Sequence, residues 1–365
     1  MGKPMAENKY EIVKRGLQTV IESGEYSVGD KLPTESELMD QYGVSRYTVR
    51  RAISDLQNEH YVYRIQGGGM YVDDWQGNQR QQAINNKMIG VVTTHLADYI
   101  FPSIISGIDR AISAQGYSLI VSNTHNNRDK ERQSLRQMID NKVAGLIIEP
   151  TQSALPDPNI DLYQEVAKQQ IPCIFINAHY PQLDAPYLEV KDREAEREMV
   201  EHLMGMGHQR ILGIFQVDDM QGLHRMQGFI NAYMAHPEIS YLSETVMYQS
   251  GQDMTKVLEQ VARILDKPER PTAVVCYNDE LAIQIMDVIR SLDLTIPEDV
   301  SIVGFDDFVL SRYLEPRLTT IEHPKEKMGL DAGKMIMARI NGEEVAPILY
   351  DLKMVYTESI TPPIK

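Results

Sequence analysis

The 365-residue sequence predicts an α/β protein in two parts, an N-terminal winged helix-turn-helix and a two-lobed domain with parallel sheets. Two observations predict this fold class. Near the N-terminus, a helical segment, a glycine turn and a cationic helical segment precede a glycine-rich hairpin. From Met88 onward, short apolar runs alternate with amphipathic segments, as in parallel sheets covered by helices on both faces. We expect the first domain at residues 1–73, a polar linker at 74–87 and the second domain at 88–365.

The first domain begins with a helical segment whose apolar stripe runs from Ile12 to Ile21 and which ends at Ser23-Gly24. Two further helical segments lie on either side of Gly43, the second of them from Arg46 onward. The core-facing positions of this last segment recur at helical spacing: Val49, Ala52, Ile53 and Leu56.

The opposite face of this cationic segment carries different chemistry. Arg46, Tyr47 and Arg50 lie about one turn apart, and Ser45 precedes them as an expected N-cap. Arginines and hydroxyls near the N-terminus of a helix suit the major groove of DNA. Taken alone, the same pattern also fits a solvated cationic helix face.

A hairpin is expected after the cationic helix, because residues 61–64 and 70–72 are apolar and aromatic and Gln66-Gly67-Gly68-Gly69 joins them. Three consecutive glycines permit positive φ angles and a close approach to a phosphate or to the minor groove. They fit a simple hairpin turn equally well. The helix-turn-helix beside them favours a winged helix, and therefore a regulator that binds DNA.

The net charge of −16 excludes a protein that coats nucleic acid with its whole surface. Residues 1–73 hold nine Lys and Arg against eleven Asp and Glu, so most of the excess negative charge lies in the second domain. Between Gln41 and Ser54 there are three arginines and no carboxylate. We therefore expect contact with DNA to be confined to this local cationic patch.

The second domain contains two series of strand-like apolar runs, which predict two lobes. The first series is 89–92, 118–121, 145–148 and 173–176, and the second is 211–215, 273–276 and 301–305. In open α/β sheets, ligands bind at the carboxyl ends of the strands. The cleft between the two lobes is therefore the expected ligand site.

Polar side chains follow several of these runs, and they suit a ligand with many hydroxyl groups. Glu149, Asn278 and Asp306 come at or just after strand ends, and their oxygens and amides can form paired hydrogen bonds with vicinal hydroxyls. Asp279 and Asp307 either point into the same cleft or cap and turn the chain. The aromatic residues available to cover the apolar face of a sugar are Tyr99, Phe101 and Phe229.

The motifs of an enzyme or a metalloprotein are missing from the sequence. No P-loop, Gly-x-Ser-x-Gly, His-x-x-x-His or Cys-x-x-Cys spacing occurs, so neither a metal nor a cofactor is expected. His202 and His208 fit helix-end groups better than metal ligands. Cys173 and Cys276 lie in apolar runs and are expected to be buried free thiols, in keeping with a cytoplasmic protein that has no signal segment or membrane helix.

Two sets of motifs resemble known families. Residues 32–38 with residues 44–50 resemble the winged-helix signature of the GntR family. Six spaced segments, in the family's order, resemble the effector domain of the LacI/GalR family, which has a two-lobed, periplasmic-binding-protein-like fold. These segments are 190–192, 202–211, 225–229, 277–279, 297–307 and 318–321.

A GntR-type head on a LacI/GalR-type body resembles the arabinose-responsive repressors, and residues 98–105 and 149–155 strengthen this match. The resemblance implies a cytoplasmic homodimer that represses genes of pentose utilisation. It also implies release from double-stranded operator DNA when the effector, L-arabinose, binds the cleft. The sequence leaves open the opposite effect of the ligand, in which it acts as a corepressor and strengthens DNA binding. Two alternative functions fit the sequence less well. A periplasmic sugar-binding protein does not need the helix-turn-helix and hairpin of residues 32–72, and a sugar-converting enzyme needs catalytic motifs that do not occur.

The resemblance also assigns residues, position by position. It implies that Arg46, Tyr47, Thr48 and Arg50 meet bases and phosphates, that Lys9 and Glu35 support or add contacts, and that Gln66, Gly67 and Gly68 form the wing. In the cleft it implies roles for Tyr99, Phe101, Glu149, Arg197, Arg225, Phe229, Asn278 and Asp306, with Phe229 as the stacking aromatic residue. The run 193–196, beside Arg197, departs from the small, Gly-containing run of the family.

Overall fold

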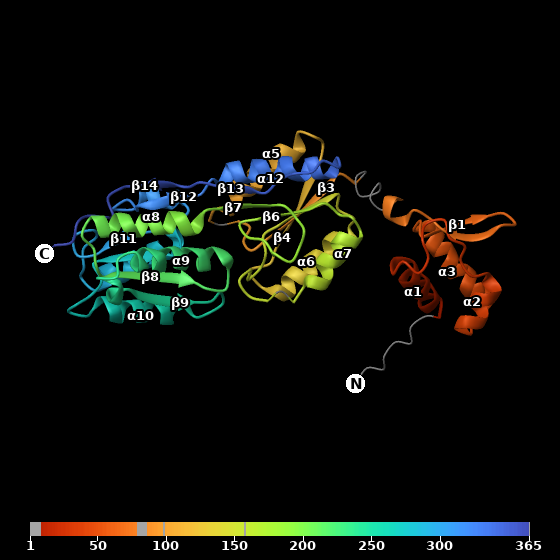
Figure 1. Cartoon of the computed structure of the whole chain (residues 1–365), viewed down its shortest axis with the longest axis horizontal. Helices are drawn as coiled ribbons and strands as arrows, with labels where there is room; N and C mark the ends of the chain where they lie inside the picture. Colours follow the sequence, from red (N-terminus) through yellow and green to blue (C-terminus); the bar gives the residue numbers. More distant parts are fainter. Residues whose placement is uncertain (1–8, 79–85, 98, 157, 365) are drawn as a thin grey trace. The chain divides into compact units, whose positions relative to one another are not determined.

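The computed structural model describes residues 9–78, 86–97, 99–156 and 158–364 (Figure 1). The chain divides into a small unit, residues 1–86, and a large unit, residues 87–365. In the described residues, no helix is long and apolar enough to span a membrane.

The small unit is a winged helix-turn-helix, as predicted. Its elements are α1 (Lys9–Glu22), α2 (Glu35–Tyr42), α3 (Arg46–Asn58), β1 (Val62–Ile65) and β2 (Gly69–Val72). Thr34 and Glu37 form a capping box at the start of α2, and Ser45 caps α3 by accepting a hydrogen bond from the backbone N–H of Thr48. Gly43 has a φ of +61° at the end of α2, which lets the chain turn into α3.

The predicted linker at 74–87 begins too early. The indole of Trp75 is only 7% exposed and stacks on the ring of Tyr61 at a centroid distance of 5.2 Å. Residues 75–78 are helical, so the start of the polar segment belongs to the small unit. The sequence did not predict this helical start, because the buried ring of Trp75 has polar neighbours on both sides and the composition of the segment is that of a linker. Residues 79–85 of the predicted linker lie outside the described residues.

The first lobe of the large unit contains a six-stranded parallel sheet in the order β13-β7-β6-β5-β3-β4. Its strands are β3 (Met88–Thr93), β4 (Ser118–Asn123), β5 (Gly145–Ile148), β6 (Cys173–Ile176), β7 (Tyr187–Val190) and β13 (Ile348–Tyr350). Its helices are α5 (Phe101–Ser113), α6 (Arg128–Asp140), α7 (Ile160–Lys168) and α12 (Lys325–Ile340).

The second lobe contains a four-stranded parallel sheet in the order β11-β10-β8-β9 and a separate antiparallel pair, β12 and β14. Its strands are β8 (Ile211–Gln216), β9 (Glu244–Tyr248), β10 (Ala273–Cys276), β11 (Ser301–Val303), β12 (Thr320–Glu322) and β14 (Lys353–Val355). Its helices are α8 (Asp192–Gly205), α9 (Met220–Met234), α10 (Met254–Leu265) and α11 (Asp279–Ser291), with 3₁₀ turns η1 (Ser240–Leu242) and η2 (Val309–Tyr313).

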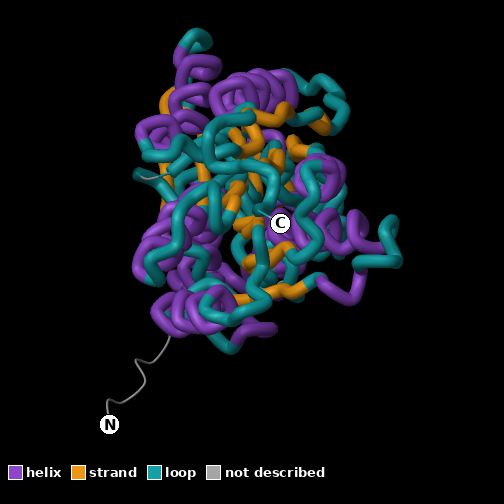
Figure 2. The backbone as a smooth tube through the Cα atoms, turned by 90° about the vertical axis from the view of Figure 1, so that its left-hand side faces the viewer, coloured by secondary structure: helices purple, strands orange, loops and turns teal. Residues whose placement is uncertain are grey.

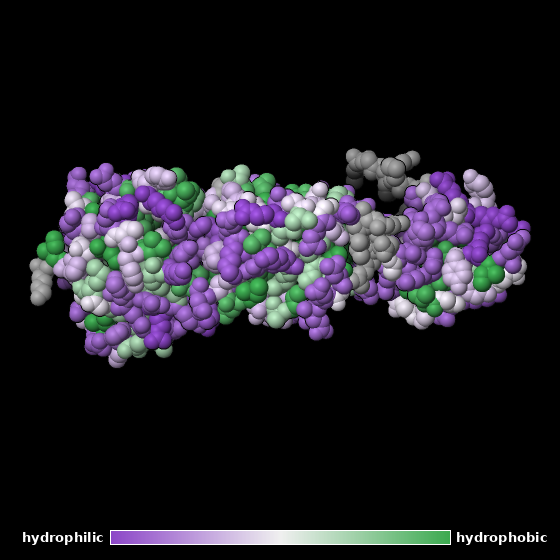
Figure 3. Space-filling view, turned by 90° about the horizontal axis from the view of Figure 1, so that it is seen from above, coloured by the Kyte–Doolittle hydropathy of each residue, from purple (hydrophilic) through white to green (hydrophobic). Residues whose placement is uncertain are grey.

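Helices cover both faces of the second lobe's sheet, and a separate apolar core lies on each face. In Figure 2 the helices (purple) flank the strands (orange) of the large unit. Each apolar run predicted as a strand coincides with one of these strands. Cys173 and Cys276 are buried free thiols, as expected. On the face of the large unit seen in Figure 3, hydrophilic side chains predominate and hydrophobic ones are scattered.

Three segments connect the two lobes: the step from β7 to α8, the step from β12 to α12, and the step from β13 to β14. Because of the second crossing, α12 returns to the first lobe and lies along α5 (Figure 1). Two glycines permit this close packing. A Cβ atom on Gly329 would lie 2.0 Å from the carbonyl oxygen of Ile104, and one on Gly107 would lie 2.5 Å from that of Glu326.

Replacing Gly329 with valine is expected to destabilise the large unit by about 3 kcal/mol, because the two helices must separate to admit the side chain. Urea unfolding followed by circular dichroism measures the change. Gly205→Ala is the matched control, since a Cβ there meets no atom within 4 Å. Equal stability of the Gly329→Val variant and the unaltered chain would contradict the close helix contact.

Candidate functional site

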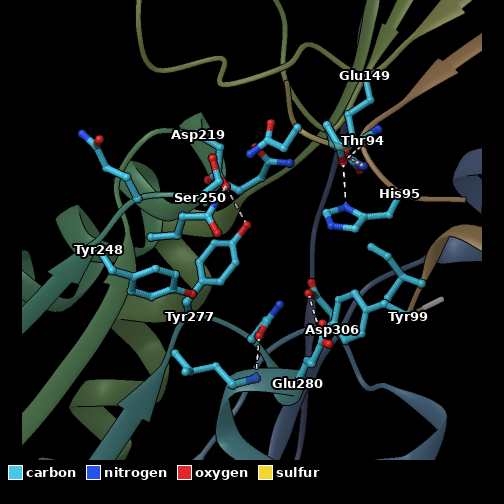
Figure 4. A pocket seen from close by; sticks show the side chains of 18 of the residues that line it. Thr94, His95, Tyr99, Glu149, Asp219, Tyr248, Ser250, Tyr277, Glu280 and Asp306 are labelled. Carbon is cyan, nitrogen blue, oxygen red and sulfur yellow. Dashed lines mark hydrogen bonds between the residues drawn. The ribbon is translucent and has the colours of Figure 1, made fainter. Parts of the chain in front are cut away.

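A polar cavity of about 340 Å³ lies in the large unit between the two lobes, where the strands of both sheets end (Figure 4). Side chains from both lobes line it, and carboxylates, amides and aromatic rings predominate. Six of the predicted cleft residues are among them: Tyr99, Phe101, Glu149, Arg225, Asn278 and Asp306. A cavity of this size and lining is suited to a small polyhydroxylated ligand.

The floor of the cavity is a buried ion-pair network around Arg225. Its Nε donates to Asp192 at 2.8 Å, Nη2 donates to Asp306 at 3.1 Å, and Nη1 donates to the carbonyl oxygen of Tyr277 at 2.6 Å. All three charged side chains are less than 6% exposed. Burial raises the pKa of Asp306, but the charge of Arg225 outweighs it, so the pKa lies below its usual value. The site therefore holds a fixed, ionised carboxylate.

Tyr99 reaches from the first lobe to this carboxylate. Its hydroxyl lies 2.6 Å from Oδ2 of Asp306 and 2.9 Å from the carbonyl oxygen of Phe305, both of which accept from it. The backbone of Tyr99 has a φ of +58°, which is strained for a residue with an aromatic side chain. This strained residue thus connects the two lobes beside the cavity.

Glu149 supplies the corresponding carboxylate from the first lobe. Its Oε2 accepts from the backbone N–H and the hydroxyl of Thr94, at 2.9 and 2.6 Å, and its Oε1 accepts from Asn177 at 2.9 Å. The side chain is 3% exposed and follows β5, as the strand-end pattern predicted. Two anchored carboxylates, Glu149 and Asp306, therefore face the cavity from opposite lobes.

Two predicted cleft residues do not reach the cavity. The ring of Phe229 is fully buried in the second lobe, where it packs on Phe215 and Tyr233. It lies one helical turn beyond Arg225 on α9, deeper in the core. Arg197 lies on the outer face of α8, is 51% exposed and pairs with Glu201 at 2.7 Å. The buried face of α8 there is taken by Glu196, so the assignments of Phe229 and Arg197 to the cleft are corrected.

Asn278 lines the cavity, as expected, and also caps α11, whereas Asp279 neither lines the cavity nor caps the helix. Asn278 lines the cavity, but its Oδ1 accepts from the backbone N–H of Leu281 and caps α11. Asp279 is fully buried and accepts from Thr320, Ser311 and the backbone N–H of Phe308. An asparagine and an aspartate are both good caps, so the pair alone did not identify which of them caps the helix.

Several cavity residues were not predicted from the sequence. Asp219 caps α9 and accepts a hydrogen bond from the hydroxyl of Tyr277 at 2.8 Å. Nε2 of His323 lies 3.3 Å from Oδ1 of Asn177, which accepts its hydrogen bond, and burial lowers the pKa of the His323 ring to about 4. Among the described residues, Nδ1 of His323 and Oε1 of Gln221 are buried without a partner, so both are open to a ligand. The remaining unpredicted polar residues include Thr94, His95 and Asn177.

A second set of contacts joins the lobes through the loop after Glu149. Nε2 of Gln152 donates to Asp218 and to Ser250, each at 3.3 Å. The backbone N–H of Ala154 donates to the carbonyl oxygen of Asp218, and that of Met220 donates to the hydroxyl of Ser153. Together with Tyr99, this loop supplies direct contacts between the two lobes beside the cavity.

A buried carboxylate near the floor predicts how stability depends on pH. Glu196 is 1% exposed, one of its oxygens lacks a partner, and burial raises its pKa to about 8. The unfolded chain has the lower, ordinary pKa, so Glu196 costs no stability below that value and destabilises the fold as the pH rises toward 8.

Glu196→Gln is therefore expected to be about as stable as the unaltered chain near pH 4 and more stable at pH 8, with the difference growing by up to about 1.4 kcal/mol per pH unit. Urea unfolding across this range measures it. Glu194→Gln, an exposed position on the same helix, is the control. An equal effect of both substitutions at pH 8 would contradict the interpretation.

The small unit presents an arginine-rich surface around α3. Arg46 and Arg50 are 64% and 61% exposed, and Tyr47 is 76% exposed. Thr48 lies in the first turn, and its hydroxyl is 2.9 Å from that of Ser45. Lys9 is exposed at the start of α1.

Gln66, Gly67 and Gly68 form the tip of the hairpin. Gly67 has a φ of +74°, so the glycine run adopts the backbone that its residue type permits. Glu35, the first residue of α2, lies between this hairpin and α3. Two of the predicted DNA-contact residues, Arg46 and Arg50, thus lie beside the carboxylate of a third, Glu35.

Comparisons with known proteins agree with both parts of the structure. Residues 9–72 match the model of bacterial regulatory proteins of the gntR family, and residues 200–357 match that of the periplasmic binding protein-like domain. The chain is 40% identical to the arabinose metabolism transcriptional repressor of Halalkalibacterium halodurans, over 97% of this chain and 96% of the relative. The chain belongs to the family of arabinose metabolism transcriptional repressors.

A second member of this family, from Geobacillus stearothermophilus, is 39% identical over 96% of the chain and 97% of its own length. Both relatives are transcriptional repressors and residues 9–72 of this chain match the gntR family, so the chain is a regulator and not an enzyme. The fold of the large unit is that of a LacI-family regulator from Enterococcus faecium with bound ribose. The TM-score is 0.66, at 23% identity, and the match covers 75% of this chain and 99% of that structure.

Proposed function

We propose that this chain is a homodimeric repressor of L-arabinose utilisation genes and that L-arabinose, bound in the cavity, releases it from operator DNA. The observation that carries the proposal is the polar cavity between the lobes, with one anchored carboxylate from each lobe. The names of both family members support arabinose as the effector.

The lining of the cavity supports a pentose as ligand. Glu149 and Asp306 are anchored by donors on their outer sides and can accept hydrogen bonds from sugar hydroxyls at opposite ends of the ring. Asp219 and Asn278 add an acceptor and an amide donor from the second lobe. The rings of Phe101 and Tyr277 line the cavity and can cover the apolar face of a sugar.

Closure of the lobes supplies the coupling to DNA. A ligand that contacts both lobes stabilises the arrangement in which Gln152 meets Asp218. It can shift the DNA-binding equilibrium only by its difference in affinity for the two arrangements, which is typically about 1–3 kcal/mol. In the proposal, two copies of the chain bind a roughly palindromic operator, with one head on each half-site.

Titration calorimetry with L-arabinose, D-xylose, D-galactose and D-ribose tests the ligand. Saturable binding of L-arabinose and no binding of the other three sugars supports the proposal. No binding heat with any of the four would rule out L-arabinose as the effector. Adding L-arabinose to a preformed complex with operator DNA tests the sign of the response. Loss of the complex supports induction, and a more stable complex identifies the sugar as a corepressor.

A further inference from the structure

Three arginines from two different elements lie within 4.0 Å of the carboxylate of Glu35. Its Oε2 accepts from Nε of Arg50 at 3.0 Å, and its Oε1 accepts from Nη2 of Arg64 at 2.9 Å. Nε of Arg46 lies 3.9 Å from Oε2, beyond hydrogen-bond distance. Each carboxylate oxygen therefore holds one arginine, and Arg46 is left outside the hydrogen-bonded set.

Arg64 differs from the other two arginines in its position. Arg46 and Arg50 lie on α3, whereas Arg64 lies on β1, two residues before Gln66 at the hairpin tip. Its side chain is 39% exposed, and together with Glu35 it lines a small recess between the hairpin and α2. The Arg64–Glu35 pair therefore ties the hairpin to the start of α2.

The pair also determines how Arg50 is presented. Arg50 uses Nε to bind Glu35, and within the described residues its two terminal nitrogens make no further hydrogen bond. These two nitrogens are the ones that can meet a guanine edge side by side. Burial raises the pKa of Glu35, but the hydrogen bonds and charges of Arg50 and Arg64 outweigh it, so the carboxylate stays ionised.

We propose that Arg64 is a positioning residue for DNA recognition, which by pairing with Glu35 keeps Arg50 aimed outward and Arg46 free. Without Arg64, one positive charge fewer balances the carboxylate of Glu35, so its attraction for Arg46, whose Nε lies 3.9 Å from Oε2, increases. Arg46 and Arg50 would then both turn toward Glu35, and the hairpin tip would lose its tie to α2. This inference rests on the proposed function as a DNA-binding repressor.

The test uses the full chain and a DNA duplex that the unaltered protein enriches from a randomised pool. Arg64→Ala is expected to weaken binding of this duplex about tenfold at fixed salt, while Arg64→Lys, which can still donate to Glu35, stays within about threefold. The slope of log affinity against log salt is expected to be unchanged, because Arg64 acts through Glu35 and not on a phosphate.

A double-mutant cycle with Glu35→Gln separates the two roles. If Arg64 acts through Glu35, Arg64→Ala weakens binding little further in the Glu35→Gln background. Additive losses together with a salt slope reduced by about 0.9 would overturn the inference in favour of a direct phosphate contact. Unchanged affinity of Arg64→Ala would overturn it as well.

Arg51→Ala is the matched control, since Arg51 is also an arginine of the small unit but lies on α3 and stacks on Tyr10 at 4.0 Å. Arg51→Ala is expected to bind the duplex within about twofold of the unaltered chain after allowance for one lost charge. Failure of the unaltered protein to enrich any duplex would count against the proposed function. Enrichment with no effect of Arg64→Ala would count against the inference alone.

Discussion

Arg50→Ala is expected to weaken operator binding by about 5- to 150-fold and to leave sugar binding unchanged, because a bidentate arginine–guanine contact is worth about 1–3 kcal/mol. Arg50 is 61% exposed, so little of the fold depends on its side chain. The hydrogen bond from its Nε to Glu35 fixes the direction of the guanidinium before DNA arrives. This preorganisation avoids part of the entropy that a free arginine would lose on binding.

Fluorescence anisotropy with an operator duplex measures the loss, and calorimetry with the sugar measures the unchanged site. Arg51→Ala again serves as control, because it removes the same charge from the same helix without touching the group around Glu35. If Arg50→Ala and Arg51→Ala weaken binding equally, the arginines act only through their charge and the recognition face is wrongly assigned. Equal affinity of Arg50→Ala and the unaltered chain would reject the face altogether.

The helices of the small unit could be predicted from the sequence because their ends carry local signals. Thr34 and Ser45 cap α2 and α3, and Gly43 turns the chain between them. These signals depend only on residues three or four positions away, so one sequence suffices. Trp75 shows the limit, because its contact with Tyr61 joins residues that no local pattern connects.

Some strands of the large unit could likewise be predicted from the sequence, and others could not. The central strands β3, β5, β8 and β10 are buried on both faces and appear as continuous apolar runs. The strands β7, β9, β12, β13 and β14 were not predicted. They are short or lie away from the sheet centres, and they carry polar or exposed residues such as Glu189 and Glu244. Without full burial, their composition does not differ from that of a loop.

The cavity shows which features of a site the sequence carries. The rule that ligands bind at the ends of parallel strands predicted that Glu149 and Asp306 lie at the cleft, and both line the cavity, because the rule depends on topology alone. The rule did not predict which way the side chains of Phe229 and Arg197 point. Phe229 lies one helical turn after Arg225, which lines the cavity, and Arg197 lies next to Glu196, which is buried. The contacts of Tyr99 and Gln152 with the second lobe join residues far apart in the chain, and no local pattern predicts them.

Asp306→Asn is expected to weaken sugar binding by about 10- to 150-fold and to leave operator binding intact, which gives a repressor that sugar no longer releases. The magnitude follows from the loss of hydrogen bonds to an ionised acceptor, worth about 1.5–3 kcal/mol. Asparagine is the suitable replacement because residue 306 has a φ of +94°, which asparagine tolerates better than alanine, and because it keeps the shape of the side chain. Arg225 keeps its hydrogen bond to Asp192, so the floor of the cavity retains one ion pair.

Asp307→Asn is the matched control for this substitution. Asp307 is the next residue, also has a positive φ and is also a buried carboxylate, but it pairs with Arg312 and does not line the sugar cavity. Calorimetry with L-arabinose should therefore distinguish the two variants, and thermal unfolding should verify that both fold. Sugar affinity equal to that of the unaltered chain in Asp306→Asn would remove Asp306 from the site. An equal loss in both variants would attribute the effect to the local fold, because Asp306 lines the cavity and Asp307 does not.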